Sequence, residues 1–176
     1  MMILISYGYV FLAIIIGLFI LSALIFLLIK PIKNLMVRHK IFKKLKGFSS
    51  SNKMYKLYKT RKMIFKYKLV LRNSIYYIYL LKNNKNYDIH FESGEFYFED
   101  KKLKKKKNIN LNDFKNYQPE PNKNRDCKKL IIVYPNCDFI YNHIDNFNSV
   151  YVYVDQELDS FHIISAVDFM NLEELK

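Results

Sequence analysis

The chain has 176 residues, of which 29 are Lys or Arg and 16 are Asp or Glu, and its formal net charge is +13 at pH 7. Two cysteines exclude a disulfide-rich scaffold, and four glycines leave little material for a phosphate-binding glycine loop. Charge is uneven along the chain: residues 30–107 hold 23 basic and 5 acidic residues, whereas residues 108–176 hold 6 and 11.

An apolar segment occupies the N-terminus. Residues 1–29 contain no charged side chain, and residues 9–29 supply the roughly 20 apolar residues that a helix needs to cross a bilayer. The apolar side chains occur on all sides of such a helix, unlike those of an amphipathic soluble helix. A basic n-region and a small-residue cleavage site, which a cleaved signal peptide would have, do not occur here. We therefore predict a transmembrane anchor at residues 1–29.

A basic cluster directly follows this anchor: Lys30, Lys33, Arg38, Lys40, Lys43, Lys44 and Lys46. By the positive-inside rule, residues 30–176 lie in the cytoplasm and the N-terminus lies outside. This indicates a single-pass protein of the cell (inner) membrane. Because inner leaflets are anionic and each nearby Lys or Arg contributes about 1 kcal/mol of attraction, we expect the cluster to contact anionic lipid at the membrane surface.

The segment of residues 30–51 is predicted to be a basic juxtamembrane helix and linker. Pro31 suits the first turn of this helix, and Gly47 and the serines after it would end the helix. A short helix is expected at residues 52–60. Residues 52–176 are long enough for one cytoplasmic domain.

Two strands are expected next, at residues 62–71 and 75–82, with a turn at residues 72–74. The second strand is apolar on both faces, which places it centrally in a sheet.

A hairpin is predicted around Ser93 and Gly94. This turn pairs Asp88 with Glu99 and His90 with Tyr97, and it puts Ile89, Phe91, Phe96 and Phe98 on one inner face. The opposite face then carries Asp88, His90, Glu92, Glu95 and Glu99. These side chains offer ligands for a divalent metal, but we favour a solvated face with the downstream lysines as counterions.

The rest of the chain alternates strands with short helices. Six lysines at residues 101–107 repel one another, which disfavours a packed element. The later predictions are a helix or turn at 111–117, a loop at 118–126, a buried strand at 129–134, a short helix or turn at 138–147, a strand at 150–154, a short edge strand at 162–164, and a terminal helix capped by Ser165 that buries Phe169 and Met170. The fold class is therefore α+β (or α/β), with a mixed sheet and flanking helices.

The cysteines and histidines give no recognisable site. The spacing of Cys127, Cys137 and His143 matches no common zinc pattern, and thiols in the cytoplasm are expected to be free. His39 and His162 are interpreted as structural or exposed. We predict no catalytic residue, metal or cofactor.

A second basic run offers an alternative partner. Lys104, Lys105, Lys106 and Lys107, with the alternating Tyr and Lys residues at 55–68, suit nucleic acid, because lysines neutralise phosphates and aromatic rings stack on bases. The same composition suits anionic lipid.

Residues 65–84, FKYKLVLRNSIYYIYLLKNN, resemble the nuclease-related domain (NERD) family, in which a strand bearing Asp precedes a strand ending in Glu-x-Lys-Asn. Lys82 and Asn83 match the Lys-Asn pair, and residues 129–139, 150–154 and 168–172 resemble the end of that domain, so that the likeness covers about 110 residues. The resemblance implies a restriction-endonuclease-like fold. Leu80 replaces the expected Glu, and Tyr67 or Lys68 replaces the expected Asp, so the metal-dependent hydrolysis of such nucleases would be lost.

The leading hypothesis is a single-pass membrane-anchored protein whose cytoplasmic domain is non-enzymatic and binds a partner. A protein is one option for this partner. The alternative is a membrane-tethered nucleic-acid-binding or degenerate nuclease-like domain.

Overall fold

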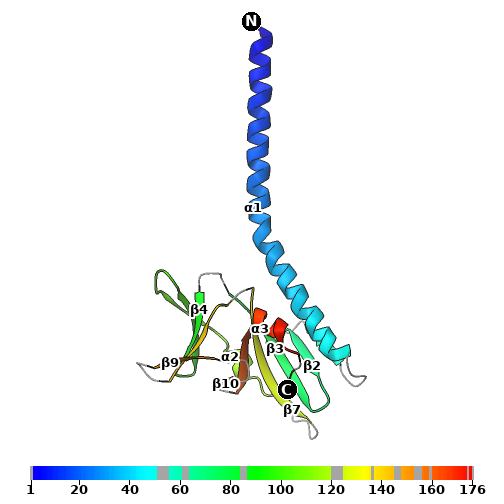
Figure 1. Ribbon diagram of the computed structural model, residues 1–176, viewed down its shortest axis with the longest axis vertical. Helices are drawn as coiled ribbons and strands as arrows, with labels where there is room; N and C mark the ends of the chain where they lie inside the picture. The colour runs from blue at the N-terminus through cyan, green and yellow to red at the C-terminus, as the bar shows by residue number, and fades with distance from the viewer. Residues whose placement is uncertain are drawn as a thin grey trace. The chain divides into compact units, whose positions relative to one another are not determined.

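The computed structural model describes residues 2–50, 56–60, 64–83, 87–119, 125–135, 137–144, 148–152, 156–158, 160–173 and 175. The chain divides into two compact units, Met1–Met36 and Val37–Lys176. Figure 1 shows the elements of both units.

The first unit consists of most of helix α1, which spans Met2–Ser50. Large apolar side chains of this unit, such as Phe19 and Phe26, are 74% and 78% exposed. By length and composition, α1 contains one segment able to cross a membrane. Pro31 lies inside the helix, although the sequence suggested that a helix begins there. Proline removes one backbone hydrogen bond, and the good helix formers on both sides continue the helix through it.

The end of α1 belongs to the second unit. Ile41 and Leu45 are fully buried there, because their spacing of four residues puts both on the helix face that contacts the sheet. The expected basic linker at residues 30–51 therefore contributes core residues from its second half. The helix also continues past Gly47 to Ser50, whose hydroxyl donates to the Gly47 carbonyl over 3.0 Å.

A six-stranded mixed sheet forms the centre of this unit. Its strand order is β1 (Lys56–Lys59), β2 (Tyr67–Val70), β3 (Ser74–Lys82), β7 (Asp126–Tyr134), β11 (Phe161–Ser165) and β10 (Glu157–Leu158). The pairs β3–β7 and β7–β11 are parallel, whereas the outer pairs are antiparallel. The central position predicted for the strand at residues 75–82 is confirmed.

A second, five-stranded sheet has the order β6 (Lys106–Ile109), β5 (Glu95–Asp100), β4 (Tyr87–Glu92), β8 (Ile140–His143) and β9 (Ser149–Tyr151). The register predicted for the β4–β5 hairpin is confirmed at every pair. Both turn residues have positive φ, 51° at Ser93 and 83° at Gly94, which matches the twist of a tight hairpin. Lys115 of helix α2 (Asn112–Lys115) donates to the Gly94 carbonyl over 3.1 Å.

Side-chain alternation along the strands arranges these elements in three layers. On β3, Ile75 and Tyr77 point into a core that also contains Ile89 and Phe96 of the five-stranded sheet. Tyr76 and Ile78 point the other way, into a core shared with α1 and with α3 (Ala166–Asn171). In Figure 1, α3 and the cyan end of α1 cover the same face of β2, β3 and β7.

The predicted α+β class, with a mixed sheet and flanking helices, is confirmed. The sequence suggested one sheet, and the structure has two, because the apolar face of the β4–β5 hairpin packs against the first sheet instead of extending it.

Several local predictions were wrong. Residues 56–59 form strand β1 instead of a helix, and residues 51–55 lie outside the described part of the chain. Residues 140–143 form strand β8 instead of a helix or turn, since pairing with β4 outweighs local propensity. Strand β11 is paired on both sides, so it is not an edge strand.

The lysine run also contains an unexpected strand. Lys106 and Lys107 begin β6, which pairs with β5 and sets Lys106 opposite Glu99. The acidic partner strand reduces the repulsion that led us to expect no packed element here. The strands predicted at residues 62–71 and 150–154 are shorter in the structure, at Tyr67–Val70 and Ser149–Tyr151; residues 61–63 and 153–155 lie outside the described part.

Candidate functional site

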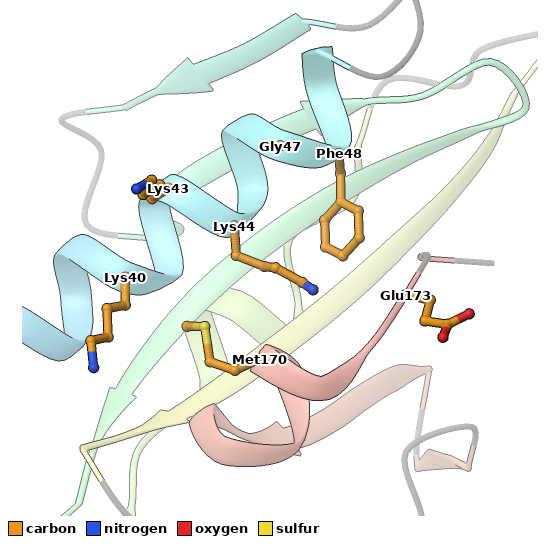
Figure 2. Close-up of a pocket in the computed structure, with 7 residues that line it drawn as sticks. All are labelled: Lys40, Lys43, Lys44, Gly47, Phe48, Met170 and Glu173. Carbon is orange, nitrogen blue, oxygen red and sulfur yellow. The ribbon is translucent and has the colours of Figure 1, made fainter.

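A groove between the end of α1 and the C-terminal segment contains several of the predicted contact residues. Its volume is about 530 Å³, and it is lined by Lys40, Lys43, Lys44, Gly47, Phe48, Met170 and Glu173. Figure 2 shows Lys44 and Phe48 pointing from α1 toward α3, and Met170 pointing back toward α1. Residues more than 120 positions apart in the sequence thus form one surface.

Local sequence explains how the groove is built. Lys40, Lys43 and Gly47 recur at helical spacing, so they share one side of α1. The buried Ile41 and Leu45 fix the helix against the sheet. Gly47 has no side chain, and the space where a Cβ would lie is open, which widens the groove.

The opposite wall is set by α3. Ser165 caps this helix by accepting a hydrogen bond from the Asp168 backbone N–H over 3.1 Å, as the sequence predicted. Phe169 is fully buried and makes an edge-to-face contact with Phe48, with ring centroids 6.1 Å apart. These contacts position Met170, one residue further on, at the groove.

The groove is electropositive. The Lys44 ammonium lies 5.2 Å from the centroid of the Phe48 ring, a cation–π geometry. Within the described part of the chain, no ion pair involves Lys40, Lys43 or Lys44. Glu173 lines the groove as well, so the lining contains three lysines and one carboxylate.

The lysines near β5 and β6 have a different environment. Lys101 Nζ lies 3.3 Å from Asp88 Oδ1 and also contacts the Asp138 carboxylate. Lys104 pairs with Glu99 at 3.2 Å, and Lys106 pairs with Glu92 at 3.4 Å. The expectation that these lysines act as counterions to the acidic hairpin face is confirmed for Asp88, Glu92 and Glu99, but the face is not solvated throughout, because His90 on it is buried. Lys105 and Lys107 are exposed.

An aromatic and imidazole cluster covers the same outer face of the five-stranded sheet. His90 Nδ1 and His143 Nε2 are 2.8 Å apart, so one ring donates a hydrogen bond to the other. The His90 ring stacks between Tyr97 and Tyr141, with centroids 5.1 Å and 4.8 Å away. Burial lowers the pKa of His90, and this outweighs the neighbouring carboxylates, which act in the opposite direction.

Sequence reasoning found only part of this cluster. The predicted register already set Tyr97 opposite His90. Tyr141 and His143 were missed, because they reach the cluster through strand β8, which had not been predicted. Alternation of Ile140, Tyr141 and Asn142 is too short a signal to identify a strand alone.

The cysteines are free thiols, as expected. Cys137 lies in the core between the sheets, whereas His143 lies on the outer face of the five-stranded sheet. Burial, together with nearby Asp88 and Asp138, raises the pKa of Cys137 to about 12. Its thiol is therefore protonated at neutral pH and is a poor nucleophile or metal ligand.

The residues behind the resemblance to NERD domains lie at the end of β3 and in the core. Lys82 is exposed, and Asn83 is buried, donating from its backbone to the Tyr134 carbonyl (2.7 Å) and from its side chain to the Tyr87 carbonyl (2.9 Å). Leu80 and Tyr67 pack in the core beneath the helices.

The other predicted contact residues also lie on α1. Lys30 and Lys33 belong to the first unit, whereas Arg38 and Lys46 belong to the second. Comparison with protein-family models, with curated proteins and with solved structures finds no match for the chain.

Proposed function

We propose that this chain is a single-pass membrane protein that holds a non-enzymatic binding domain at the cytoplasmic face of the cell membrane. The observation behind this proposal is the dual character of α1. Its first part exposes large apolar side chains, and its last part contributes the buried Ile41 and Leu45 to the core of the folded unit. One helix thus supplies both an anchor and a structural element of the domain.

The energetic argument concerns the exposed apolar side chains. Full removal of a Leu, Ile or Phe side chain from water is worth about 1.5–3 kcal/mol. The helix from Leu12 to Ile29 exposes such residues on all sides, including Leu18, Phe19 and Phe26. Lipid chains would solvate this surface, whereas a soluble chain would leave it in water.

Binding fits the second unit better than catalysis does. The Cys137 thiol is held protonated, and Lys101, Lys104 and Lys106 are engaged by carboxylates. These ion pairs also disfavour nucleic acid as the partner of this face, because a phosphate would have to displace a carboxylate from each lysine. The groove beside α1 is the better candidate for an anionic partner, because its three lysines, which form no such pair within the described part of the chain, line one cavity together with Phe48 and Met170.

Alkaline extraction of membranes from cells that express the full chain tests the anchor. We expect the chain to stay in the membrane pellet. A variant with Ile16→Arg, Ile20→Arg and Leu24→Arg should appear in the supernatant, because each arginine at the centre of a membrane helix costs about 2.5–3.5 kcal/mol. Release of the unchanged chain by alkali would refute the proposal.

Thiol labelling tests the orientation. Lys102 is exposed, so a Lys102→Cys variant offers an accessible thiol in the second unit. We expect a membrane-impermeant maleimide to label it only in permeabilised cells, with the parent chain as control. Labelling in intact cells would show that the second unit lies outside the cell, which is the opposite of the proposed topology. Substrate turnover by the purified chain, abolished by one substitution, would overturn the binding role.

A further inference from the structure

We propose that the groove lined by α1 and the C-terminal segment binds the phosphate-bearing headgroup of an anionic membrane lipid. This inference rests on the membrane anchoring proposed above and names the partner of the groove. It commits to a lipid rather than to a soluble anion.

Charge is the first argument. Lys40, Lys43 and Lys44 present three ammonium groups that no carboxylate in the described part of the chain neutralises by an ion pair. Lysine carries three donors on a flexible stem, which suits the several oxygens of a phosphate. Glu173 at the groove favours a ligand that also carries hydroxyl or ammonium donors beside its phosphate, as glycerol and amine headgroups do.

The apolar lining is the second argument. Phe48 and Met170 extend into the groove (Figure 2), and Gly47 leaves its wall without a side chain. A free phosphate gains nothing from such a surface. The glycerol and first acyl carbons of a lipid would bury it, at about 25 cal/mol per Å² of apolar area removed from water.

Pre-organisation is the third argument. The helix that carries the lysines is fixed by Ile41 and Leu45, both fully buried. The lysine backbones therefore need little ordering on binding, which lowers the entropic cost. In the sequence, Lys40 follows Lys30 by only ten residues, so a short stretch of chain joins the groove to the end of the apolar segment.

The test measures lipid retained by the full chain. The chain is purified from vesicles of phosphatidylcholine with or without phosphatidylglycerol, and native mass spectrometry counts bound lipid across a phosphatidylglycerol titration. We expect selective binding of phosphatidylglycerol. A variant with Lys40→Gln, Lys43→Gln and Lys44→Gln should bind about 100-fold more weakly, since each lysine near an anionic surface contributes about a fivefold factor and three such factors multiply to roughly that loss.

Two further variants separate the groove from general charge. The control with Lys102→Gln, Lys105→Gln and Lys107→Gln removes the same net charge from exposed positions of the other lysine-rich region. It should retain selective binding. The variant Gly47→Glu places a carboxylate at the groove where there is open space, and it favours the helix, so the chain should fold but lose the selectivity.

The outcomes are distinct. Equal loss in the groove variant and the control would overturn the proposal in favour of non-specific attraction. Competition by glycerol phosphate or by a polyglutamate peptide as strongly as by the lipid would overturn the choice of a lipid. If the unchanged chain fails to enter phosphatidylcholine vesicles at all, the membrane anchoring itself has failed. If it enters them but shows no preference for phosphatidylglycerol, only the groove proposal falls.

Discussion

Two lysine-rich regions of this protein differ in what surrounds their charges. At the end of α1, Lys40, Lys43 and Lys44 face a groove with an apolar lining and one carboxylate. Around β5 and β6, Lys101 and Lys104 pair with carboxylates of the chain itself. The sequence alone makes both regions look like binding surfaces for an anion. The comparison teaches that a run of lysines is a candidate anion-binding surface only where the fold does not already supply the counter-charge.

Secondary structure produces this difference. In the antiparallel β5–β6 pair, the register sets Lys106 opposite Glu99, so acids and lysines meet on one face. In α1, the buried Ile41 and Leu45 occupy the side opposite Lys43, Lys44 lies beside them, and Met2–Ser50 contains no acidic residue. A helix can therefore present basic side chains without partners while its other face holds it in place.

The largest effect should come from the residues that hold the helix. Leu45→Ala removes a fully buried side chain and should lower the free energy of unfolding by about 2–5 kcal/mol. Urea unfolding of the full chain in detergent micelles, followed by circular dichroism, measures this. The control Leu103→Ala alters an exposed leucine beside the other lysines and should change stability by no more than about 0.5 kcal/mol. Equal effects would mean that the helix end is not part of the core.

A smaller loss is expected when a paired lysine is neutralised. Lys101→Gln leaves the Asp88 carboxylate, which is 15% exposed, without its ammonium partner. The cost should be about 1–3 kcal/mol, as for other mostly buried polar groups left unpaired. Lys102→Gln changes the adjacent, exposed lysine and serves as the control in the same urea assay. A Lys101→Gln variant as stable as this control would show that the ion pair is not formed in solution.

The sequence predicted those features that depend on local pattern. The β4–β5 register followed from one turn and from alternation, and the Ser165 cap followed from its spacing to Asp168. The groove could not be predicted in this way, because it combines residues of α1 with Met170 and Glu173, and only tertiary packing brings these together. The same holds for the contact between His90 and His143, which required knowing that β8 pairs in parallel with β4.

Acidification should destabilise the five-stranded sheet, because His90 lies on its outer face. The pKa of His90 is lowered from 6.5, so as pH falls below 6.5 the unfolded chain takes up a proton before the folded chain does. The contribution of neutral His90 to the free energy of unfolding is fully present above pH 6.5, and it is lost as the pH falls toward the pKa of His90 in the folded chain. Glu99 and Asp88 oppose this shift, whereas His143 and Lys106 add to burial in lowering the pKa.

Urea unfolding between about pH 8 and about pH 5 should therefore show a falling free energy, and His90→Gln should reduce the slope. Carboxylates with lowered pKa, such as Glu92, lose their contribution only at lower pH, below their usual value of 4.5. His39→Gln, on the exposed surface of α1, is the matched control and should keep the slope. An unchanged slope in His90→Gln would exclude the imidazole pair as its source.

The smallest effects should have opposite signs in the two regions. Lys104 pairs with Glu99 but is 72% exposed, so Lys104→Gln should destabilise the chain by less than about 1 kcal/mol, and less still at high salt.

Lys43 has no ion pair in the described part of the chain, and the chain carries a net charge of +13. Removing its charge relieves repulsion, so Lys43→Gln should be neutral or slightly stabilising at low salt. Thermal unfolding of both variants at low and high salt compares the signs directly. If Lys43→Gln proves destabilising in proportion to Lys104→Gln, the lysines of α1 have a counter-charge within the protein, and the contrast between the two regions disappears.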